Sequence, residues 1–172
     1  MYKLTYTLLL SIILLSCSRQ TEPETATAVT LKMDSLASFN PFSVKPNSAR
    51  PLAIVSYLNV SCPPCLDEIK QWQAFDTKHN DGQFEIKLVC YAEDDFEFFK
   101  YLCREKQLTK FPYAFVLDTT QNFAVRNPLM KDKASEKTVI VDAKGKVLAS
   151  GSPLHNESIL EVYKKIINSA RL

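Results

Sequence analysis

Y-L-N-V-S-C-P-P-C-L-D-E-I-K, residues 57–70, joins an apolar run to a pattern that is typical of a helix. Two cysteines, Cys62 and Cys65, stand at this junction with two prolines between them. Cysteines at this spacing can form a redox couple, supply two metal ligands or close a fixed disulfide. The segments on either side predict the fold that carries the pair, and the fold narrows the chemistry.

The segments next to the pair indicate a strand, a helix and a second strand. Residues 52–58 are almost continuously apolar, as a strand buried on both faces should be. Apolar residues recur at spacings of three and four from Cys65 to Trp72, which predicts a helix over residues 63–78. Hydrophobic and charged residues alternate over 84–90, which predicts the second strand.

The rest of the chain continues this alternation. In chain order, the sequence predicts a helix that opens at Asp94 and Asp95, a strand over 113–118, a hairpin of 138–142 and 146–150, and a closing helix over 157–169. Residues 30–50 predict a short strand or loop at the edge of the domain. Strands that alternate with helices and end in a hairpin predict an α/β fold, with a mixed central sheet whose first strands are parallel and whose faces are covered by helices.

The N-terminus carries the features of an export signal. An apolar block from Leu8 to Leu15 follows Lys3, and it is too short for a transmembrane helix, which needs about 20 apolar residues. The block ends in L-L-S-C, which resembles the lipobox of bacterial lipoproteins. This resemblance implies a signal peptide over residues 1–16 and lipidation of Cys17. An ordinary secreted protein with a chance cysteine is the alternative.

The predicted organisation is therefore a signal peptide (1–16), a lipidated cysteine with a flexible tether (17–30) and one folded domain (31–172). The tether is predicted because S-R-Q-T-E-P-E-T-A-T-A-V is polar and has little to bury. Removal of 1–16 takes away Lys3 and lowers the formal net charge from +2 to +1, which gives no electrostatic footprint for nucleic acid. The predicted location is the cell envelope, on the periplasmic or extracellular side of a bacterial membrane.

The position of Cys62 at the start of the predicted helix favours its thiolate. Unpaired N–H groups and the positive end of the helix dipole lie at the first turn, and both stabilise a negative sulfur. Cys65 follows nearly one turn later, so it can attack a mixed disulfide at Cys62 without a second molecular encounter. Pro63 and Pro64 lack N–H groups, which predicts a less acidic Cys62 than a histidine-bearing dipeptide would give, and a reducing or neutral poise.

A strand, C-x-x-C and a helix, followed by a closing hairpin and a C-terminal helix, resemble the thioredoxin-like superfamily over residues 52–172. The stretch S-C-P-P-C-L-D-E-I is similar to membrane-anchored bacterial thiol-disulfide oxidoreductases, and residues 111–155 resemble thioredoxin-like lipoproteins of Bacteroidetes. The resemblance implies a thioredoxin-like fold and disulfide exchange with protein thiols, protein disulfides and an upstream redox partner. It implies no organic cofactor, because the cysteines carry the electrons. It also implies that Glu68 assists proton transfer at Cys65.

Three positions depart from the pattern of that superfamily. Ser61 replaces the tryptophan that many relatives have before the first cysteine, and Lys70 replaces a proline that kinks the helix. Lys137 stands where relatives carry a cis-proline that shapes the substrate groove. Lys137 is therefore a candidate groove residue together with Pro63 and Pro64, and its ammonium would favour the thiolate of the first cysteine. Between these interpretations of Lys137, the sequence favours an exposed lysine at the end of a strand.

Two other interpretations of the cysteine pair stay open. The pair can be a stable disulfide in a redox-inert binding module on the cell envelope. A metal site would need Cys90 and Cys103, and these spacings match no common zinc pattern, so no metal is predicted. Cys90 and Cys103 fall on predicted core faces and are expected to be buried, with a bond between them as the alternative.

Overall fold

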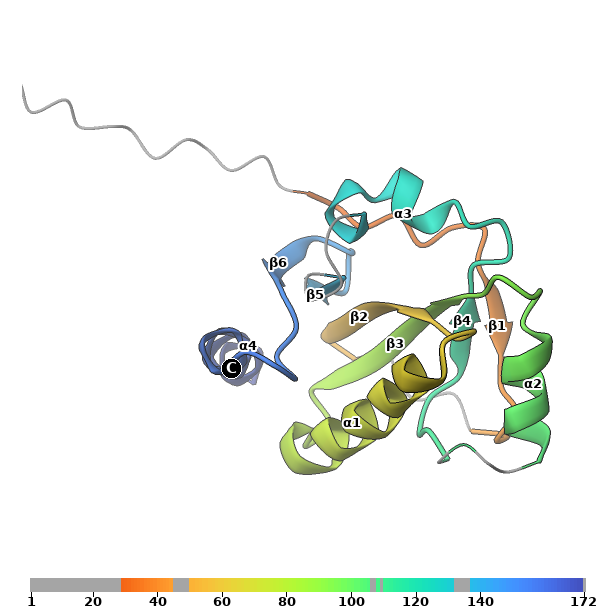
Figure 1. The fold of residues 1–172 in the computed structure, drawn as a ribbon. Helices are drawn as coiled ribbons and strands as arrows, with labels where there is room; N and C mark the ends of the chain where they lie inside the picture. Colours follow the sequence, from red (N-terminus) through yellow and green to blue (C-terminus); the bar gives the residue numbers. More distant parts are fainter. Residues whose placement is uncertain (1–28, 45–49, 106–107, 109, 132–136, 172) are drawn as a thin grey trace, which may run out of the picture.

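A six-stranded mixed sheet forms the centre of the molecule (Figure 1). The computed structural model describes residues 29–44, 50–105, 108, 110–131 and 137–171. The strands are β1 (Ala37–Phe39), β2 (Leu52–Asn59), β3 (Phe84–Tyr91), β4 (Phe115–Leu117), β5 (Thr138–Asp142) and β6 (Val147–Ser150), in the spatial order β1-β4-β3-β2-β5-β6. β2, β3 and β4 run parallel, and the other pairings are antiparallel. The predicted mixed sheet with parallel first strands and a closing hairpin is confirmed.

Helices lie against both faces of this sheet (Figure 1). They are α1 (Pro63–His79), α2 (Glu97–Arg104), α3 (Phe123–Arg126), the 3-10 turn η1 (Pro128–Met130) and α4 (Glu157–Ser169). α1, α2 and α4 share one apolar core with the sheet, and α3 and η1 share a second core on the opposite face. The domain is therefore layered, with the sheet between two sets of apolar contacts.

β2 is buried on both faces, as its continuous apolar sequence predicts. Ile54 and Leu58 point to the core that contains α1, and Val55 and Tyr57 point to the core that contains α3. Ser56 is the polar exception, and it is only 2% exposed. A buried hydroxyl needs a hydrogen-bond partner, and Ser56 finds its partners beside the cysteine pair.

An N-terminal strap, residues 29–36, connects the two edges of the sheet. It starts beside β6, where the N–H of Val147 donates to the carbonyl of Val29 at 2.8 Å. The N–H of Leu31 then donates to the carbonyl of Gly145 at 2.8 Å, and the Leu31 side chain is buried in the core that contains α3. The strap leads into β1, which pairs with β4. The expected edge strand between residues 30 and 50 is therefore present.

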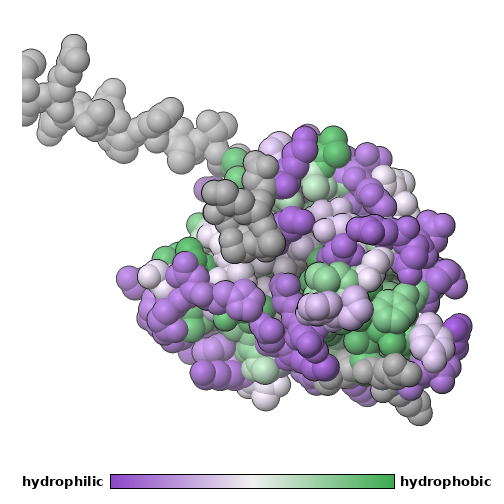
Figure 2. Space-filling view, in the orientation of Figure 1, coloured by the Kyte–Doolittle hydropathy of each residue, from purple (hydrophilic) through white to green (hydrophobic). Residues whose placement is uncertain are grey.

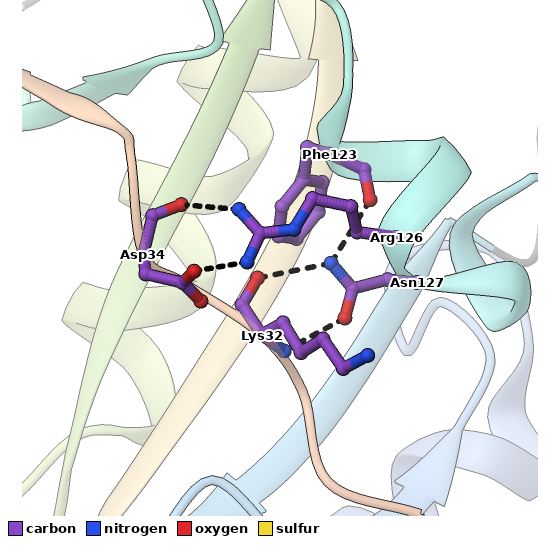
Figure 3. A network of polar contacts seen from close by, with 5 residues as sticks. All are labelled: Lys32, Asp34, Phe123, Arg126 and Asn127. Atoms are coloured by element: carbon purple, nitrogen blue, oxygen red, sulfur yellow. Dashed lines mark hydrogen bonds and ion pairs between the residues drawn. The ribbon is translucent and has the colours of Figure 1, made fainter.

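Polar side chains near α3 hold the strap in place (Figure 3). The Asn127 side chain accepts the N–H of Lys32 at 2.7 Å and donates to the Lys32 carbonyl at 3.0 Å, and it also donates to the carbonyl of Phe123 at 2.9 Å. Arg126 donates to the carbonyl of Asp34 at 3.0 Å and pairs with its carboxylate. Asn127 is only 4% exposed, so its bond to Phe123 is buried, whereas its two bonds to the exposed Lys32 are partly buried.

The sequence predicts a helix that opens at Asp94, but α2 begins at Glu97. Asp95 and Phe96 have left-handed backbone angles, with φ of 52° and 66°, which do not fit a right-handed helix. The Asp94 carboxylate instead accepts the N–H of Phe98 at 3.1 Å. Asp94 therefore accepts N–H groups of the first turn of α2 from a turn in front of the helix.

Figure 2 shows a largely hydrophilic face with scattered apolar patches. Within the described residues, no helix is long and apolar enough to cross a bilayer. The predicted signal peptide over 1–16 and the predicted lipidation site Cys17 lie outside the described residues.

Candidate redox site

Cys62 and Cys65 form a disulfide at the junction of β2 and α1, with their Cα atoms 5.2 Å apart. Cys62 is the N-cap of α1 and has an extended backbone, with φ of −102° and ψ of 112°. Its carbonyl accepts the N–H groups of Cys65 at 2.9 Å and Leu66 at 3.3 Å. Both cysteines are partly exposed. The pair therefore combines access to solvent with the positive end of a 17-residue helix.

The two prolines occupy the first turn of α1, and both are exposed. Ser61 fixes the chain in front of them: its hydroxyl donates to the Asp94 carboxylate at 2.9 Å and accepts the N–H of Glu93 at 2.8 Å. Ser61 also donates its N–H to the side chain of Asn59 at 2.9 Å. These bonds connect the loop that carries the cysteines to the loop between β3 and α2.

Glu68 follows Cys65 by three residues on α1, so the two side chains lie on the same side of the helix. The Glu68 carboxylate accepts the indole N–H of Trp72 at 3.1 Å and the hydroxyl of Ser56 at 3.5 Å. Burial raises the pKa of Glu68, while these hydrogen bonds and the charges of His155 and Lys137 act in the opposite direction. The carboxyl group therefore keeps its proton to a higher pH than a solvated glutamate does.

Ser56 extends this polar contact into the sheet. Its hydroxyl lies 3.0 Å from the hydroxyl of Thr138 on the neighbouring strand β5, where the two residues are direct register partners. Thr138 is 2% exposed. Trp72 is fully buried and also donates to Glu68. The carboxyl group of Glu68 is thus held from both the helix and the sheet.

Lys137 comes directly before β5 and is half-buried, so the favoured interpretation of an exposed lysine is wrong. Its Nζ lies 5.7 Å from the ring centre of Tyr57, 5.3 Å from that of Tyr91 and 3.4 Å from the Tyr91 hydroxyl. Its carbonyl accepts the N–H of Tyr57 at 2.8 Å. The ammonium group therefore lies over two aromatic rings, which is a favourable cation–π position.

The comparison with known families agrees with this geometry. Residues 22–164 match the family model described as Redoxin. The chain belongs to the Redoxin family. No curated protein matches the chain.

Solved structures show the same fold at low identity. An uncharacterized thioredoxin-like protein from Porphyromonas gingivalis has a TM-score of 0.54 and 21% identity, with 81% of this chain and 90% of that chain covered. A putative thiol:disulfide interchange protein DsbE from Chlorobium tepidum has a TM-score of 0.53 and 12% identity, with coverage of 82% and 99%. A putative thiol-disulfide oxidoreductase from Bacteroides vulgatus has a TM-score of 0.54 and 10% identity, with coverage of 87% and 92%. This Redoxin domain therefore has a thioredoxin-like fold.

Cys90 and Cys103 lie apart from the redox pair of this Redoxin domain. Both are free and buried, Cys90 on β3 and Cys103 on α2, as predicted from their positions on the apolar faces of these elements. Burial raises the pKa of Cys90 far above its usual range and raises the pKa of Cys103 to about 11. A neutral thiol is a poor nucleophile, so both behave as small hydrophobic side chains. Among the described residues, no three His, Cys, Asp or Glu side chains gather as a metal site.

Sequence reasoning misses the polar partners that hold the Redoxin site. Ser56 gives a signal, because it is a small polar residue in the middle of a largely apolar strand. Asp118 gives none: it is 1% exposed, accepts the hydroxyl of Tyr57 at 3.1 Å and accepts the N–H of Phe123 at 2.9 Å. Burial, followed by the charge of Asp118, raises the pKa of Tyr57. Asp118 thus links the strand that leads to the cysteines with the start of α3.

Proposed function

We propose that this protein is a thiol-disulfide oxidoreductase that exchanges disulfides with other proteins in the bacterial cell envelope. The observation that carries the proposal is the partly exposed Cys62–Cys65 disulfide at the N-terminus of α1. Membership of the Redoxin family and the thioredoxin-like fold support this chemistry in general. The partner, the direction of electron flow and the location belong to the proposal.

In the reducing direction, the reaction starts from two reduced cysteines. The Cys62 thiolate attacks one sulfur of a substrate disulfide, forms a mixed disulfide and releases the other substrate sulfur as a thiolate. Cys65 then loses its proton and attacks the Cys62 sulfur, which releases the second substrate sulfur. The products are two substrate thiols and the Cys62–Cys65 disulfide, so two electrons pass to the substrate. The oxidising direction is the reverse.

Glu68 is proposed as the proton acceptor for Cys65. It lies one helical turn after Cys65, and its carboxyl group is already bound to Trp72 and Ser56. Because burial raises the pKa of Glu68, a proton taken from Cys65 is held better than on a solvated glutamate. Pro63, Pro64 and Lys137 are proposed to line the groove that receives the substrate chain.

Lipidation of Cys17 is proposed to place the domain at the membrane. The supporting observation is the sequence L-L-S-C after a short apolar block. Incorporation of a radioactive or alkyne-tagged fatty acid into the native chain, and its loss in Cys17→Ser, tests this part separately from the redox chemistry.

The redox proposal is tested by the midpoint potential of the cysteine pair in glutathione buffers. Known exchange catalysts lie between about −120 and −270 mV, and a value in this range is expected. Reduction of insulin disulfides by the native chain, but not by Cys62→Ser, is the matching activity measurement. A potential below about −300 mV together with inactivity toward insulin would assign the pair to a structural disulfide in a redox-inert binding module.

A further inference from the structure

Exposed lysines gather at the end of the sheet that lies opposite the cysteine pair. β2 runs from Leu52 to Asn59, and the cysteine loop follows its C-terminal end. Leu52 is the register partner of Asp142, so the hairpin turn after Asp142 lies at the other end of β2. An eight-residue strand is about 25 Å long. The hairpin turn and the redox site are therefore separated by most of the domain.

Three lysines define this lysine end of the molecule: Lys32, Lys144 and Lys146. All three are exposed, and a bridge between Thr30 and Lys146 brings the strap beside the hairpin turn. The ion pairs among the described residues include none of the three. Asp142, the nearest acidic residue in sequence to Lys144 and Lys146, uses its carboxylate to accept their N–H groups at 2.8 Å and 2.9 Å. Asp34, the nearest acidic residue to Lys32, pairs with Arg126.

The opposite end of the molecule is acidic. Glu93, Asp94 and Asp95 follow β3, and all three are exposed. They lie beside the redox site, because the Asp94 carboxylate accepts the hydroxyl of Ser61 at 2.9 Å. Three exposed lysines therefore lie beyond the first residue of β2 and three exposed carboxylates lie near its last residue, in a chain whose formal net charge is only +2.

The chain enters the folded domain at the lysine end. Val29, the first described residue, is bonded to Val147 of the hairpin and is 45% exposed. Twelve residue steps separate Cys17 from Val29, and a chain of that length reaches at most about 40 Å. A lipid on Cys17 would hold the lysine end within that distance of the bilayer, at a high effective concentration.

We propose that the lysine end binds an anionic phospholipid surface and that the cysteine pair faces away from it. The orientation rests on the proposed lipidation of Cys17, whereas the binding surface itself does not. A lysine near an anionic leaflet contributes about 1 kcal/mol, which is about fivefold in the binding constant. Three lysines together raise the binding constant about a hundredfold. This binding is weak by itself, but it becomes effective when a tether keeps the domain close to the membrane. Repulsion of the acidic end by the same surface adds to the orientation.

The test is the reactivity of individual lysines on vesicles. The full chain, expressed with its own N-terminus and recovered from the host, is mixed with phosphatidylcholine vesicles that contain or lack phosphatidylglycerol. Bound protein is acetylated briefly, and mass spectrometry gives the rate at each lysine. On phosphatidylglycerol, we expect acetylation of Lys32, Lys144 and Lys146 to slow at least fivefold, with Lys70 and Lys100 unchanged. High salt should restore the rates.

A matched pair of variants controls for charge. Lys144→Glu with Lys146→Glu should abolish the protection of Lys32, whereas Lys70→Glu with Lys100→Glu makes the same change of charge on α1 and α2 and should leave it intact. Equal acetylation rates on the two kinds of vesicle, or protection of Lys70 and Lys100 instead, would overturn the proposal.

Flotation of the same samples separates this proposal from the lipid anchor. A lipidated chain floats with both kinds of vesicle. If the chain floats only with vesicles that contain phosphatidylglycerol, and the double variant Lys144→Glu with Lys146→Glu no longer floats, the protein binds through the lysine end and carries no lipid anchor. A chain that floats with neither overturns both. Insulin reduction by the same preparation reports separately on the redox function.

Discussion

At the scale of single residues, the ionisation of Glu68 connects its proposed role in proton transfer with the stability of the fold. Burial raises the pKa of Glu68 in the folded protein, so folding favours the protonated form. This stabilisation is complete below the unfolded pKa of about 4.3 and is lost as the pH rises through the folded pKa. Glu68→Gln stays neutral and can still accept the Trp72 N–H. The variant should therefore be more stable than the native protein at pH 7 and should lose this advantage below about pH 4.

Urea midpoints from pH 3.5 to 8 measure this difference, with Asp67→Asn as a control on the exposed side of α1. Glu68→Gln should also slow insulin reduction at pH 7 by about a hundredfold, since general-base catalysis contributes at least that much. Native activity combined with higher stability would remove Glu68 from the reaction and leave it as a structural residue.

The reactivity of the thiols should separate the four cysteines of the domain. After mild reduction, Cys62 should react with iodoacetamide within minutes at pH 7.5, because it is partly exposed at a helix N-terminus. Cys90 and Cys103 should react only on unfolding, because burial raises the pKa of both thiols. Mass spectrometry of the labelled peptides gives each rate. Fast labelling of Cys103 in the folded protein would contradict its position in the core.

At the scale of elements, the hydrogen bonds of Asn127 hold the N-terminal strap against α3. Asn127→Ala removes one buried and two partly buried hydrogen bonds and leaves the N–H and carbonyl of Lys32 without those partners. The expected loss is about 2 to 3 kcal/mol of unfolding free energy. Cleavage within the strap by trypsin, at Lys32, should accelerate before the rest of the domain unfolds.

Asn40→Ala is the matched control for this variant. Asn40 also bonds both the N–H and the carbonyl of one residue, Val44, but these bonds are local and exposed. The control should cost less than about 1 kcal/mol and leave cleavage at Lys32 unchanged. If the two variants behaved alike, the strap would be held by its apolar side chains and not by Asn127.

The elements also show which parts of the structure can be predicted from sequence. The long ones, β2, β3, α1 and α4, repeat their apolar residues often enough to define a period and are predicted almost to the residue. α3 has four residues, too few for a period, and the side chain that starts it belongs to Asp118, outside the helix. α2 starts late because Asp95 and Phe96 adopt left-handed angles, which aspartate adopts more readily than most residues but for which phenylalanine gives no signal.

At the scale of the whole molecule, the same contrast applies to the redox site. The position of the cysteine pair is predicted from sequence, because it depends only on the strand before the pair and the helix after it. The contact between Glu68 and Ser56 is not predicted, because it forms only when α1 packs on β2. The contact between Ser56 and Thr138 is not predicted either, because the two residues are separated by 82 positions in the sequence and meet only through the register of β2 and β5. Lys137 follows the same rule, since its aromatic contacts come from β2 and β3.

The fold itself should not depend on the disulfide. The two cores lie on either side of the sheet and are filled by side chains such as Trp72 and Tyr163, none of which the disulfide holds. A disulfide that closes a four-residue loop restricts the unfolded chain by only about 2 kcal/mol in the chain-entropy estimate. Reduction should therefore lower the unfolding free energy by about 2 kcal/mol or less and leave the far-ultraviolet circular dichroism unchanged.

Urea unfolding with and without a phosphine reductant measures this difference, and Cys62→Ser with Cys65→Ser should not respond to the reductant. Thermodynamic linkage adds a second, independent check. The change in stability on reduction must equal the difference in reduction potential between the folded and unfolded pair, and about 2 kcal/mol corresponds to about 40 mV for two electrons. A domain that unfolds on reduction would have a folded potential far below that of the unfolded chain, which is the behaviour of a structural staple and not of an exchange catalyst.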